Sequence, residues 1–395
     1  MKNYEYKITI PPPAQRVLDE LAGAGHMAYV VGGCVRDSLL GLEPHDWDIC
    51  TSARPEQVID VFGAERVILT GLKHGTVTVR EDGESFEVTT FRVDGPYSDG
   101  RQPDSVQFGG NLIEDLMRRD FTMNAMAYHP AEGLIDPFGG REDIDSRLLR
   151  CVGDAYARFS EDALRILRAV RFSAVYGFRI GSYTRYAMAT EARMLGGIAK
   201  ERVGAEVRKL LAGRYAAAVI RENIAVLNVI IPYLQDILNC SQNNSYHYAN
   251  VFEHTMDAMA ASWREEVFPA EWADEYVRAA LFFHDFGKAA VKTCDEQGYE
   301  HFYGHPKVSA ERVDEILRGL RMPNEYRRTV VQLVENHDAT LYPSLPSARR
   351  WLLRLGEEQL QRLMKMQECD AAAHVASVHK KRFADLKTFS DCVDM

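Results

Sequence analysis

The first 150 residues alternate between short apolar runs and segments with helical periodicity. Apolar runs rich in β-branched residues predict strands, at 27–31, 46–50, 76–80 and 84–92. Helical patterns cover 35–40 and 55–62, where Pro55 is acceptable at a helix start. The segment 91–106 is rich in Gly, Pro, Asp and Ser, so we expect a flexible loop there. These patterns predict a mixed α/β head.

After Cys151 the pattern changes to long segments with a period of 3.6 residues, and no convincing strand is predicted. A turn-rich stretch at 239–245 interrupts the helices. We therefore expect an α+β protein with a mixed sheet in a head (1–150), an all-α neck (151–240) and a helical body (241–395).

Composition is that of an ordinary globular protein, with 46% hydrophobic and 26% charged residues over 395 positions. No apolar run is long enough to span a bilayer, and the seven cysteines are dispersed. We expect a cytoplasmic protein with reduced thiols and no membrane partner. The net charge is −10, but a basic stretch from Arg147 to Arg221 could face an RNA backbone or form ordinary helix ion pairs.

A possible phosphate cradle follows the first predicted strand. Gly32 and Gly33 precede a helix that carries Arg36. Glycines allow a phosphate to approach the backbone, the helix start attracts anions, and an arginine adds a charge-assisted contact. On its own, however, a Gly-Gly pair at a strand end is more often only a tight turn.

Two acids on the next predicted strand favour a phosphate-binding turn over an ordinary tight turn. Period-two geometry places Asp46 and Asp48 on the same face, about 6 to 7 Å apart along the chain. Paired carboxylates of this kind suit Mg²⁺, which can activate an attacking hydroxyl and stabilise a leaving pyrophosphate. The sequence therefore predicts that both are catalytic metal ligands beside a triphosphate site.

These residues belong to four ordered motifs that resemble the class II tRNA nucleotidyltransferases and bacterial poly(A) polymerases, within the DNA polymerase β-like superfamily. The segment GGCVRDSLLGLEPHDWDI resembles motif A, RRDFTMNAMAY motif B, DPFGG motif C and SEDALRILRAVRF motif D. The resemblance covers roughly residues 20 to 215. It implies a polymerase β-like head and the addition of CCA from CTP and ATP to the 3′ end of tRNA.

Motif D predicts how one site selects both C and A. We expect Ser160 to cap a helix that begins at Glu161, so that Asp162 and Arg165 point together into a cleft. An acceptor and a donor match the amino group and ring nitrogen that cytosine and adenine share. We include Arg168 and Arg171 in the predicted nucleotide site. The alternative is a helix with ordinary ion pairs.

Motif B and a nearby strand add further candidates. Arg119, Asp120 and Asn124 are expected to contact the triphosphate and ribose. Glu87 is either a third carboxylate near the metals or an exposed strand residue.

A second signature, LFFHDFGK, resembles the HD phosphohydrolase superfamily. An adjacent histidine and aspartate can hold a cation together, and imidazoles with carboxylates suit Mn, Fe, Ni, Co or Zn better than Mg. The predicted ligands of this second metal centre occur in the order His254, His284, Asp285, His305, His337 and Asp370. The resemblance implies a phosphohydrolase for phosphomonoesters or cyclic phosphates, such as a damaged 3′ end, or an inactive scaffold that grips RNA.

Three alternatives to CCA addition remain. A poly(A) polymerase shares the head motifs, although the chain lacks an extended basic C-terminal tail. A CC-only enzyme is disfavoured by the loop 91–106 with Asp94, Asp99 and Arg101. The third alternative makes the HD centre the main activity, with the head as a degenerate RNA-binding module.

Overall fold

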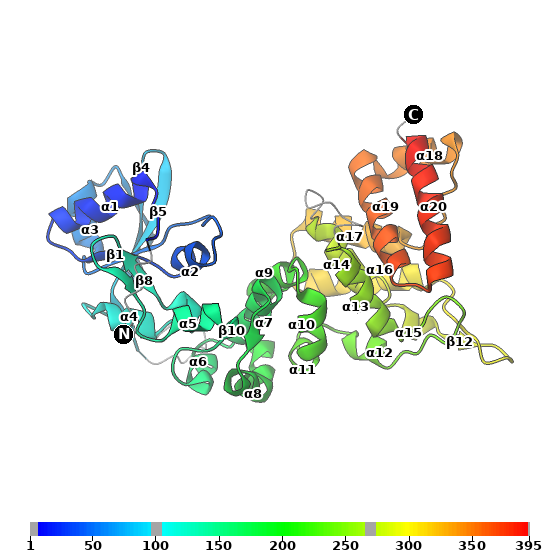
Figure 1. The fold of residues 1–395 in the computed structure, drawn as a ribbon, viewed down its shortest axis with the longest axis horizontal. Coiled ribbons are helices and arrows are strands. Elements are labelled where there is room, and N and C mark those ends of the chain that lie inside the picture. The colour runs from blue at the N-terminus through cyan, green and yellow to red at the C-terminus, as the bar shows by residue number, and fades with distance from the viewer. Residues whose placement is uncertain (1–6, 96–104, 265–273, 394–395) are drawn as a thin grey trace. The chain divides into compact units, whose positions relative to one another are not determined.

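The computed structural model describes residues 7–95, 105–264 and 274–393. Contacts divide the chain into two compact units (Figure 1). The first comprises Met1–Arg165 and Phe178–Glu191, and the second Ile166–Gly177 and Ala192–Met395. The expected boundaries at 150 and 240 do not coincide with this division, and the division into three domains stays a prediction.

Within the described residues, the first unit is built on a seven-stranded sheet with the strand order β3-β4-β5-β2-β1-β8-β9. Strands β2 and β5 run parallel and the other neighbours antiparallel. This confirms the mixed sheet. The strands are β1 (Ala28–Val31), β2 (Ile49–Thr51), β3 (Val67–Gly71), β4 (Thr76–Glu81), β5 (Glu84–Thr90), β8 (Ala127–His129) and β9 (Gly133–Ile135).

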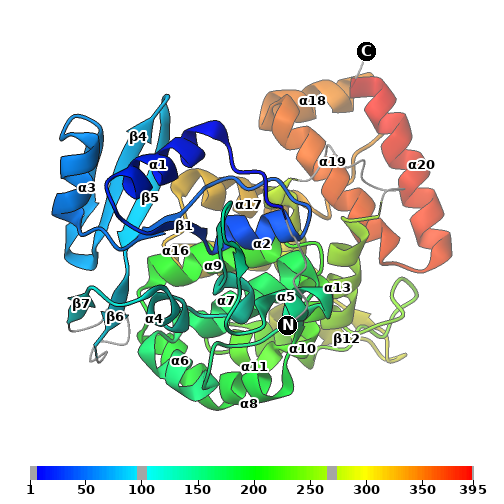
Figure 2. The ribbon, with the colours of Figure 1, turned by 60° about the vertical axis from the view of Figure 1, so that its left-hand side comes forward.

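Helices cover both faces of this sheet (Figure 2). Tyr29, Val31 and Cys50 pack with Leu112 and Leu116 of α4 in one hydrophobic cluster. Because strand side chains alternate, the other face of β1 points to the side where α1 and α3 pack. The helices of this unit are α1 (Pro12–Gly23), α2 (Gly33–Leu39), α3 (Pro55–Phe62), α4 (Leu112–Met117), α5 (Gly140–Asp145), α6 (Ala155–Glu161) and α8 (Ser182–Glu191), with 3-10 turns η1 (Leu72–His74) and η2 (Thr122–Asn124).

The expected loop at 91–106 is partly wrong. Strand β6 (Arg92–Asp94) pairs with β7 (Val106–Phe108) in a two-stranded ribbon, so the chain stays extended at both ends of the segment. Arg92 Nε lies 3.0 Å from Asp94 Oδ1 within β6. Asp99 and Arg101, which were expected to contribute to the loop, lie outside the described residues.

The second unit is helical. It contains α7 (Leu164–Tyr176), which begins at the end of the first unit, η3 (Ala192–Gly197), α9 (Lys200–Leu211), α10 (Ala216–Glu222), α11 (Ile224–Leu227), α12 (Leu234–Leu238), α13 (Val251–Ala261), α14 (Glu275–Phe283), α15 (Lys288–Val291), α16 (His305–Gly319), α17 (Asn324–Asn336), α18 (Leu345–Leu355), α19 (Glu357–Ala372) and α20 (Ala376–Val393). Helices α13, α14 and α19 pack against one another, and α17 packs on α14 and α16. Among the described residues no helix is both long and apolar enough to cross a bilayer.

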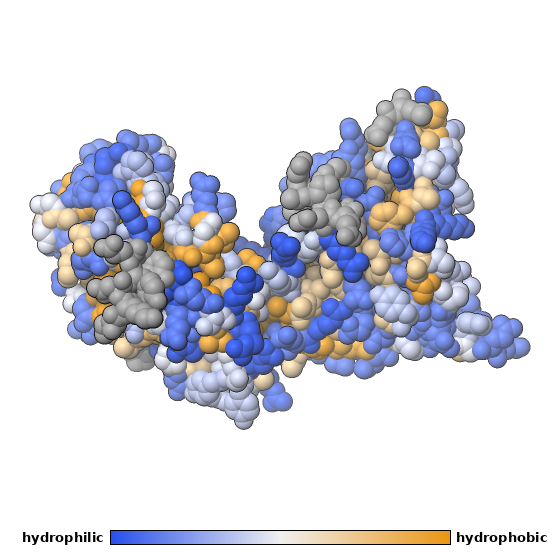
Figure 3. All heavy atoms as spheres, viewed as in Figure 1, coloured by the Kyte–Doolittle hydropathy of each residue, from blue (hydrophilic) through white to orange (hydrophobic). Residues whose placement is uncertain are grey.

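The expectation of no strand after Cys151 is wrong at two places. Strand β11 (Arg179–Ile180) pairs in parallel with β10 (Leu148–Leu149), and β12 (Thr293–Cys294) forms a hairpin with β13 (Glu300–His301). The surface of this hairpin in view is hydrophilic (Figure 3). Each strand has two residues, too few for an alternating pattern to be recognised in the sequence.

Candidate active site and second metal centre

The two acids of motif A lie at the end of the head sheet. Strand β2 begins at Ile49, so the expected strand at 46–50 starts too early. One further hydrogen bond of the ladder precedes the strand, because the Val31 N–H donates to Asp48 O (3.0 Å). The partner strand then turns away at Gly32, which has φ 81°. Trp47 is buried while Asp46 is exposed and Asp48 half-buried. The residue between the two acids thus packs into the core, while both acids keep access to solvent.

Glu87 stands beside Asp48 on the adjacent strand. The parallel register pairs Ile49 with Val88, and one residue earlier it brings Asp48 opposite Glu87 on the same face. Burial raises the pKa of Asp48, opposed by Arg119 and reinforced by Glu87 and Asp46. Three acids therefore share one negative field, as a site for a divalent cation requires.

The glycine turn joins motif A to motif B. The Gly32 N–H donates to Met126 O (3.1 Å), and α2 begins at Gly33. Arg36 Nη1 donates to Asn124 Oδ1 (2.6 Å), and Asn124 Nδ2 donates to Asp120 Oδ1 (3.0 Å). Arg36, Asn124 and Asp120, which are all predicted to contact the nucleotide, are thus linked by hydrogen bonds next to the turn.

Arg119 lies directly against the glycine turn. A Cβ on Gly32 would stand 2.7 Å from Arg119 Nη1, so a side chain at this position would displace the end of this guanidinium. Arg119 and Arg118 both pair with the buried Asp115, at 3.4 Å and 2.7 Å. Arg119 is a cation held next to the acids, whereas Arg118 is committed to an ion pair.

Motif C supports motif B. Asp136 accepts hydrogen bonds from the N–H groups of Gly140 and Arg141, both at 2.8 Å, and so starts α5. The backbone at Gly140 packs so closely on Thr122 O that a Cβ would collide with it. Asp136 therefore holds the start of α5, and the first residue of that helix packs against the 3-10 turn Thr122–Asn124.

The expected helix start in motif D is wrong. Ser160 lies inside α6, which ends at Glu161, and α7 begins only at Leu164. Asp162 is the extended residue between them (φ −147°), and its Oδ1 accepts from the Leu164 N–H at 3.1 Å. An aspartate that satisfies a free helix N–H is a good cap, and this competes with continuing the helix through position 162.

Arg165 is held in one orientation from several sides. Its Nη2 donates to Arg118 O (3.0 Å), and its Nη1 donates to Arg158 O (3.2 Å) and to Glu161 Oε2 (2.5 Å). The side chain therefore bridges motif D to the backbone of motif B. Asp162 is its neighbour across one turn, since the Arg165 N–H donates to Asp162 O (3.0 Å).

Arg168 and Arg171 lie in the second unit. Both guanidinium groups stand over the ring of Phe172, at 5.3 Å and 3.8 Å from its centroid. Arg171 Nε also lies 2.6 Å from Glu206 Oε2. This geometry favours a packing role for Arg171, and its nucleotide contact stays a prediction.

All six predicted ligands of the second metal centre come together in the second unit. His254 Nε2 is 2.9 Å from Asp370 Oδ1, and His284 Nε2 is 3.2 Å from Asp285 Oδ2. His305 Nε2 is 3.3 Å from Asp285 Oδ1 and 3.1 Å from the Nε2 atom of His337. The helices α13, α14, α16, α17 and α19 carry or adjoin these residues, which explains why ligands spread over 117 positions, from 254 to 370, share one cluster.

The imidazoles of this cluster have a common orientation. The Nδ1 atoms of His254, His284, His305 and His337 face backbone carbonyls, at 3.3, 2.7, 2.9 and 2.7 Å respectively. Carbonyls only accept, so each Nδ1 carries a hydrogen, and in the neutral ring each Nε2 presents its lone pair to the centre. Burial, aided by His284 and His305, lowers the pKa of His337 to about 3, which keeps this ligand neutral.

The six side chains divide into two sets that share Asp285, and each set has the spacing of ligands around a cation. Ligand atoms about 2.1 Å from one ion are about 3.0 to 3.8 Å apart at angles of about 90° to 130°. The first set, around Asp285 Oδ2, has separations of 2.9, 3.2, 3.5 and 3.8 Å, and the second, around Oδ1, of 3.1, 3.3 and 3.8 Å. His284 Nε2 and Asp285 Oδ1 are buried without a hydrogen-bond partner among the described residues, as expected of metal-binding atoms, whereas Asp285 Oδ2 forms an ion pair with Lys288 Nζ (2.7 Å).

Sequence reasoning missed several residues beside this centre. Lys288 Nζ lies 2.7 Å from Asp285 Oδ2, and Arg382 Nη1 donates to Asp370 Oδ2 (2.9 Å). His247 and His374 line the same cavity of about 550 Å³ as the cluster. His374 was detectable, because it lies four residues after Asp370 and so shares its helix face. Lys288 was detectable too, because it ends the segment LFFHDFGK three residues after Asp285. His247 and Arg382 carry no such signal.

Comparison with known proteins agrees with these features. The model described as "Poly A polymerase head domain" matches residues 28–150, "Probable RNA and SrmB- binding site of polymerase A" matches 177–238, and "HD domain" matches 251–373. The chain is 51% identical over 209 residues to the CCA-adding enzyme of Geobacillus thermodenitrificans, and 47% identical over 221 residues to that of Leuconostoc citreum. These matches cover 52% and 56% of this chain and 51% and 54% of the relatives. The chain thus spans about half the length of the curated relatives it matches.

Solved structures extend the similarity along the chain. The CCA-adding enzyme of Bacillus stearothermophilus, solved in complex with CTP, is 32% identical with a TM-score of 0.69, over 97% of this chain and 83% of that one. The Thermotoga maritima CCA-adding enzyme, complexed with tRNA, shares the fold at 20% identity with a TM-score of 0.59, over 98% of this chain and 84% of that one. The resemblance stated from the motifs is confirmed. The chain belongs to the poly(A) polymerase and tRNA nucleotidyltransferase family, in the branch that contains the CCA-adding enzymes.

Proposed function

We propose that this protein adds C, C and A to the 3′ end of tRNA, using CTP and ATP and no nucleic-acid template. The observation that carries the proposal is the juxtaposition of Asp46, Asp48 and Glu87 with the Gly32 turn and Arg119. The match of residues 177–238 to an RNA-binding model supports an RNA acceptor, and the relatives named above support tRNA.

The reaction joins the terminal ribose 3′-oxygen to the α-phosphorus of the incoming nucleotide and breaks the bond to pyrophosphate. Asp46 and Asp48 hold a divalent cation, Mg²⁺ in our proposal, which supplies activation of the hydroxyl and charge neutralisation at the leaving group. Arg119 and Arg36 orient the triphosphate over the glycine turn. Much of the acceleration comes from this positioning and from fixed charges.

Nucleotide choice rests on Asp162 and Arg165 in this proposal. An Asp acceptor and an Arg donor pair with the edge that cytosine and adenine share, whereas uracil and guanine leave buried polar groups unpaired. The Arg165 guanidinium is restrained by Glu161 and two backbone carbonyls. A restrained donor discriminates better than a mobile one, because it does not adjust to the wrong base.

The test supplies the full chain and Mg²⁺ with tRNA that lacks its last three nucleotides, and with each labelled NTP in turn. We expect C incorporation with CTP alone and completion to CCA when ATP is added. Continued A-tailing would identify a poly(A) polymerase, and arrest after CC would identify a CC-only enzyme. No incorporation by wild type, with Asp48→Asn as the matched blank, would overturn the proposal.

We also propose that the HD region is a metal-dependent phosphohydrolase for phosphomonoesters or cyclic phosphates. The supporting observation is the set of inward-facing Nε2 atoms around both oxygens of Asp285. Lys288 and Arg382 line the same cavity and provide positive charge for a phosphate group. Neutral imidazoles favour Mn, Fe, Ni, Co or Zn at this centre.

A crossed pair of variants separates this activity from nucleotide addition. Asp285→Asn removes a ligand from both ion positions, and Asp48→Asn removes one from the head. Hydrolysis of p-nitrophenyl phosphate and of 2′,3′-cyclic AMP with added Mn²⁺ should be lost only in the first variant, and CCA addition only in the second. An HD region that binds Mn²⁺ but hydrolyses neither substrate would instead favour the scaffold role.

A further inference from the structure

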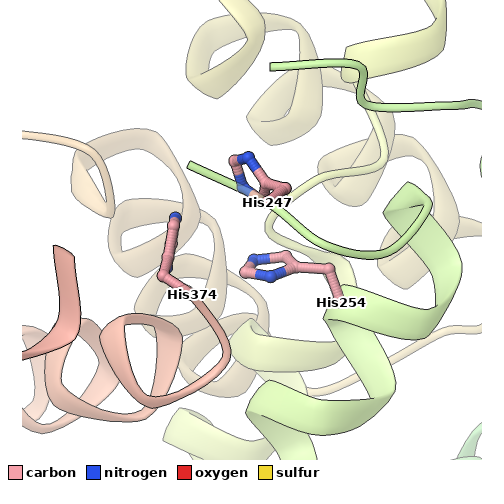
Figure 4. A group of neighbouring side chains, drawn as sticks. All are labelled: His247, His254 and His374. Atoms are coloured by element: carbon pink, nitrogen blue, oxygen red, sulfur yellow. The ribbon is translucent and has the colours of Figure 1, made fainter. Parts of the chain in front are cut away.

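A group of three histidines lies beside the HD centre, and two of them, His247 and His374, are outside its predicted ligand set. His247 precedes α13, His254 is within α13, and His374 follows α19 (Figure 4). The potential ligand nitrogens all lie within 4.8 Å of one another. The ring centroids are 4.5 Å apart for His247 and His374, 4.8 Å for His247 and His254, and 4.9 Å for His254 and His374. Segments from both ends of the domain thus bring three imidazoles around one point.

The hydrogen bonds of these rings leave acceptor atoms without donors. His247 Nδ1 lies 2.9 Å from Asn244 Oδ1, and His374 Nδ1 lies 2.8 Å from Asp370 O. With the hydrogen on Nδ1 in each case, Nε2 carries a lone pair. His247 Nε2 is buried and has no hydrogen-bond partner among the described residues. A buried acceptor without a donor is costly unless a cation or a ligand satisfies it.

We propose that His247, His254 and His374 form an additional transition-metal site, distinct from the two ion positions bridged by Asp285. Three nitrogen donors of this kind favour Zn²⁺, Co²⁺, Ni²⁺ or Cu²⁺ over Mg²⁺ or Ca²⁺. His247 and His374 line the cavity over the HD centre, so an ion held there keeps open positions toward the cavity. The proposal does not require the HD region to be a phosphohydrolase.

Sharing of His254 couples this site to the HD centre. His254 Nε2 is also 2.9 Å from Asp370 Oδ1, in the first ion position of that centre. One nitrogen lone pair binds one ion, so the two positions compete for His254. The additional site therefore binds its metal more tightly when the first HD position is disabled. A simple extension of the HD ligand set would show the opposite behaviour.

The experiment uses the metal-free full-length chain and cobalt(II) chloride as the only added metal. His284→Ala with Asp285→Asn disables both HD positions, Asp46→Asn with Asp48→Asn disables the cation site of the head, and the three histidines stay intact. We expect this background variant to retain one equivalent of cobalt in equilibrium dialysis, with visible absorption bands typical of nitrogen ligands. Adding His247→Gln or His374→Gln should abolish both signals, because glutamine keeps approximate size but removes the imidazole donor.

Two controls make the result decisive. His379→Gln on α20 lies outside the group and should leave cobalt binding unchanged, and circular dichroism confirms that every variant is folded. The proposal is overturned if the background variant binds no cobalt, or if the His247 and His374 substitutions leave cobalt bound. It is also overturned if the His247 and His374 substitutions change the affinity for a phosphate substrate while the metal content stays constant. The two histidines would then contact the substrate and not a metal ion.

Discussion

Asp48 and Glu87 lie opposite each other on neighbouring parallel strands, one residue before the paired positions Ile49 and Val88. They are 39 positions apart in the sequence, and the β2–β5 pairing turns both side chains to the same face. Burial raises the pKa of Asp48, and the charges of Glu87 and Asp46 raise it further. The head thus holds three acids close together, and a divalent cation would reduce the repulsion between their negative charges.

Glu87→Gln should lower the rate of nucleotide addition and the apparent affinity for Mg²⁺. Loss of a supporting group at a metal site typically costs about 10–100-fold. Steady-state rates over a Mg²⁺ titration measure the effect. Glu84→Gln, at the start of the same strand, is the matched control and should behave as wild type. Equal behaviour of the two variants would show that Glu87 is only an exposed strand residue.

Asp48→Asn should reduce nucleotide addition by at least about 100-fold, since a fixed charge at the reaction centre is lost. It should also stabilise the metal-free chain at pH 7. The pKa of Asp48 is raised in the folded state, so folding favours its protonated form, and the ionised carboxylate lowers stability above that pKa.

This cost disappears as the pH falls through the folded and then the unfolded pKa of Asp48. The stability difference between Asp48→Asn and wild type should therefore shrink as the pH falls from 7 and be lost below about pH 4, near the unfolded pKa of an aspartate. Urea unfolding at several pH values without Mg²⁺ tests this. A variant less stable than wild type at pH 7 would contradict the electrostatic account.

Gly32→Ala should weaken nucleotide binding beyond any effect of backbone strain. Gly32 and Gly25 both have positive φ, 81° and 86°, so alanine strains the backbone at either position. Only at Gly32 does the new methyl meet Arg119, whereas Gly25 has open space. Thermal unfolding and CTP affinity of the two variants provide the comparison. Similar CTP affinity in the two variants would show that Arg119 does not contribute to triphosphate binding.

Asp162→Asn should relax nucleotide choice while the fold remains intact. Asparagine caps a helix about as well as aspartate, so stability should change by no more than about 0.5 kcal/mol. The amide replaces a pure acceptor with a group that also donates, which permits pairing with UTP or GTP. Incorporation ratios for the four nucleotides measure this. Asp162→Ala loses both the helix cap and the base acceptor, so comparison with Asp162→Asn separates these two roles. Unchanged incorporation ratios in both variants would refute the role of Asp162 in nucleotide choice.

The motifs could be recognised in the sequence because each is local. A glycine turn after a strand, alternating acids and an adjacent His-Asp pair are fixed by neighbouring residues, and the helices at 33–39 and 55–62 follow from their own periodicity. Motif D shows the limit of this reasoning. A sequence window containing Ser160 and Glu161 favours a helix start, but the capping bond from Leu164 to Asp162 places the break two residues later.

What the sequence alone determined is the family and the mixed head with its helical remainder, and it named the acids and the six HD residues as candidates. The tertiary structure decided which of these residues share a site and how they are held. Strand register placed Glu87 beside Asp48, backbone carbonyls oriented the imidazoles, and helix packing brought His247 and His374 to the HD centre. Such contacts join residues far apart in the chain, and no local pattern encodes them because packing, not periodicity, creates them.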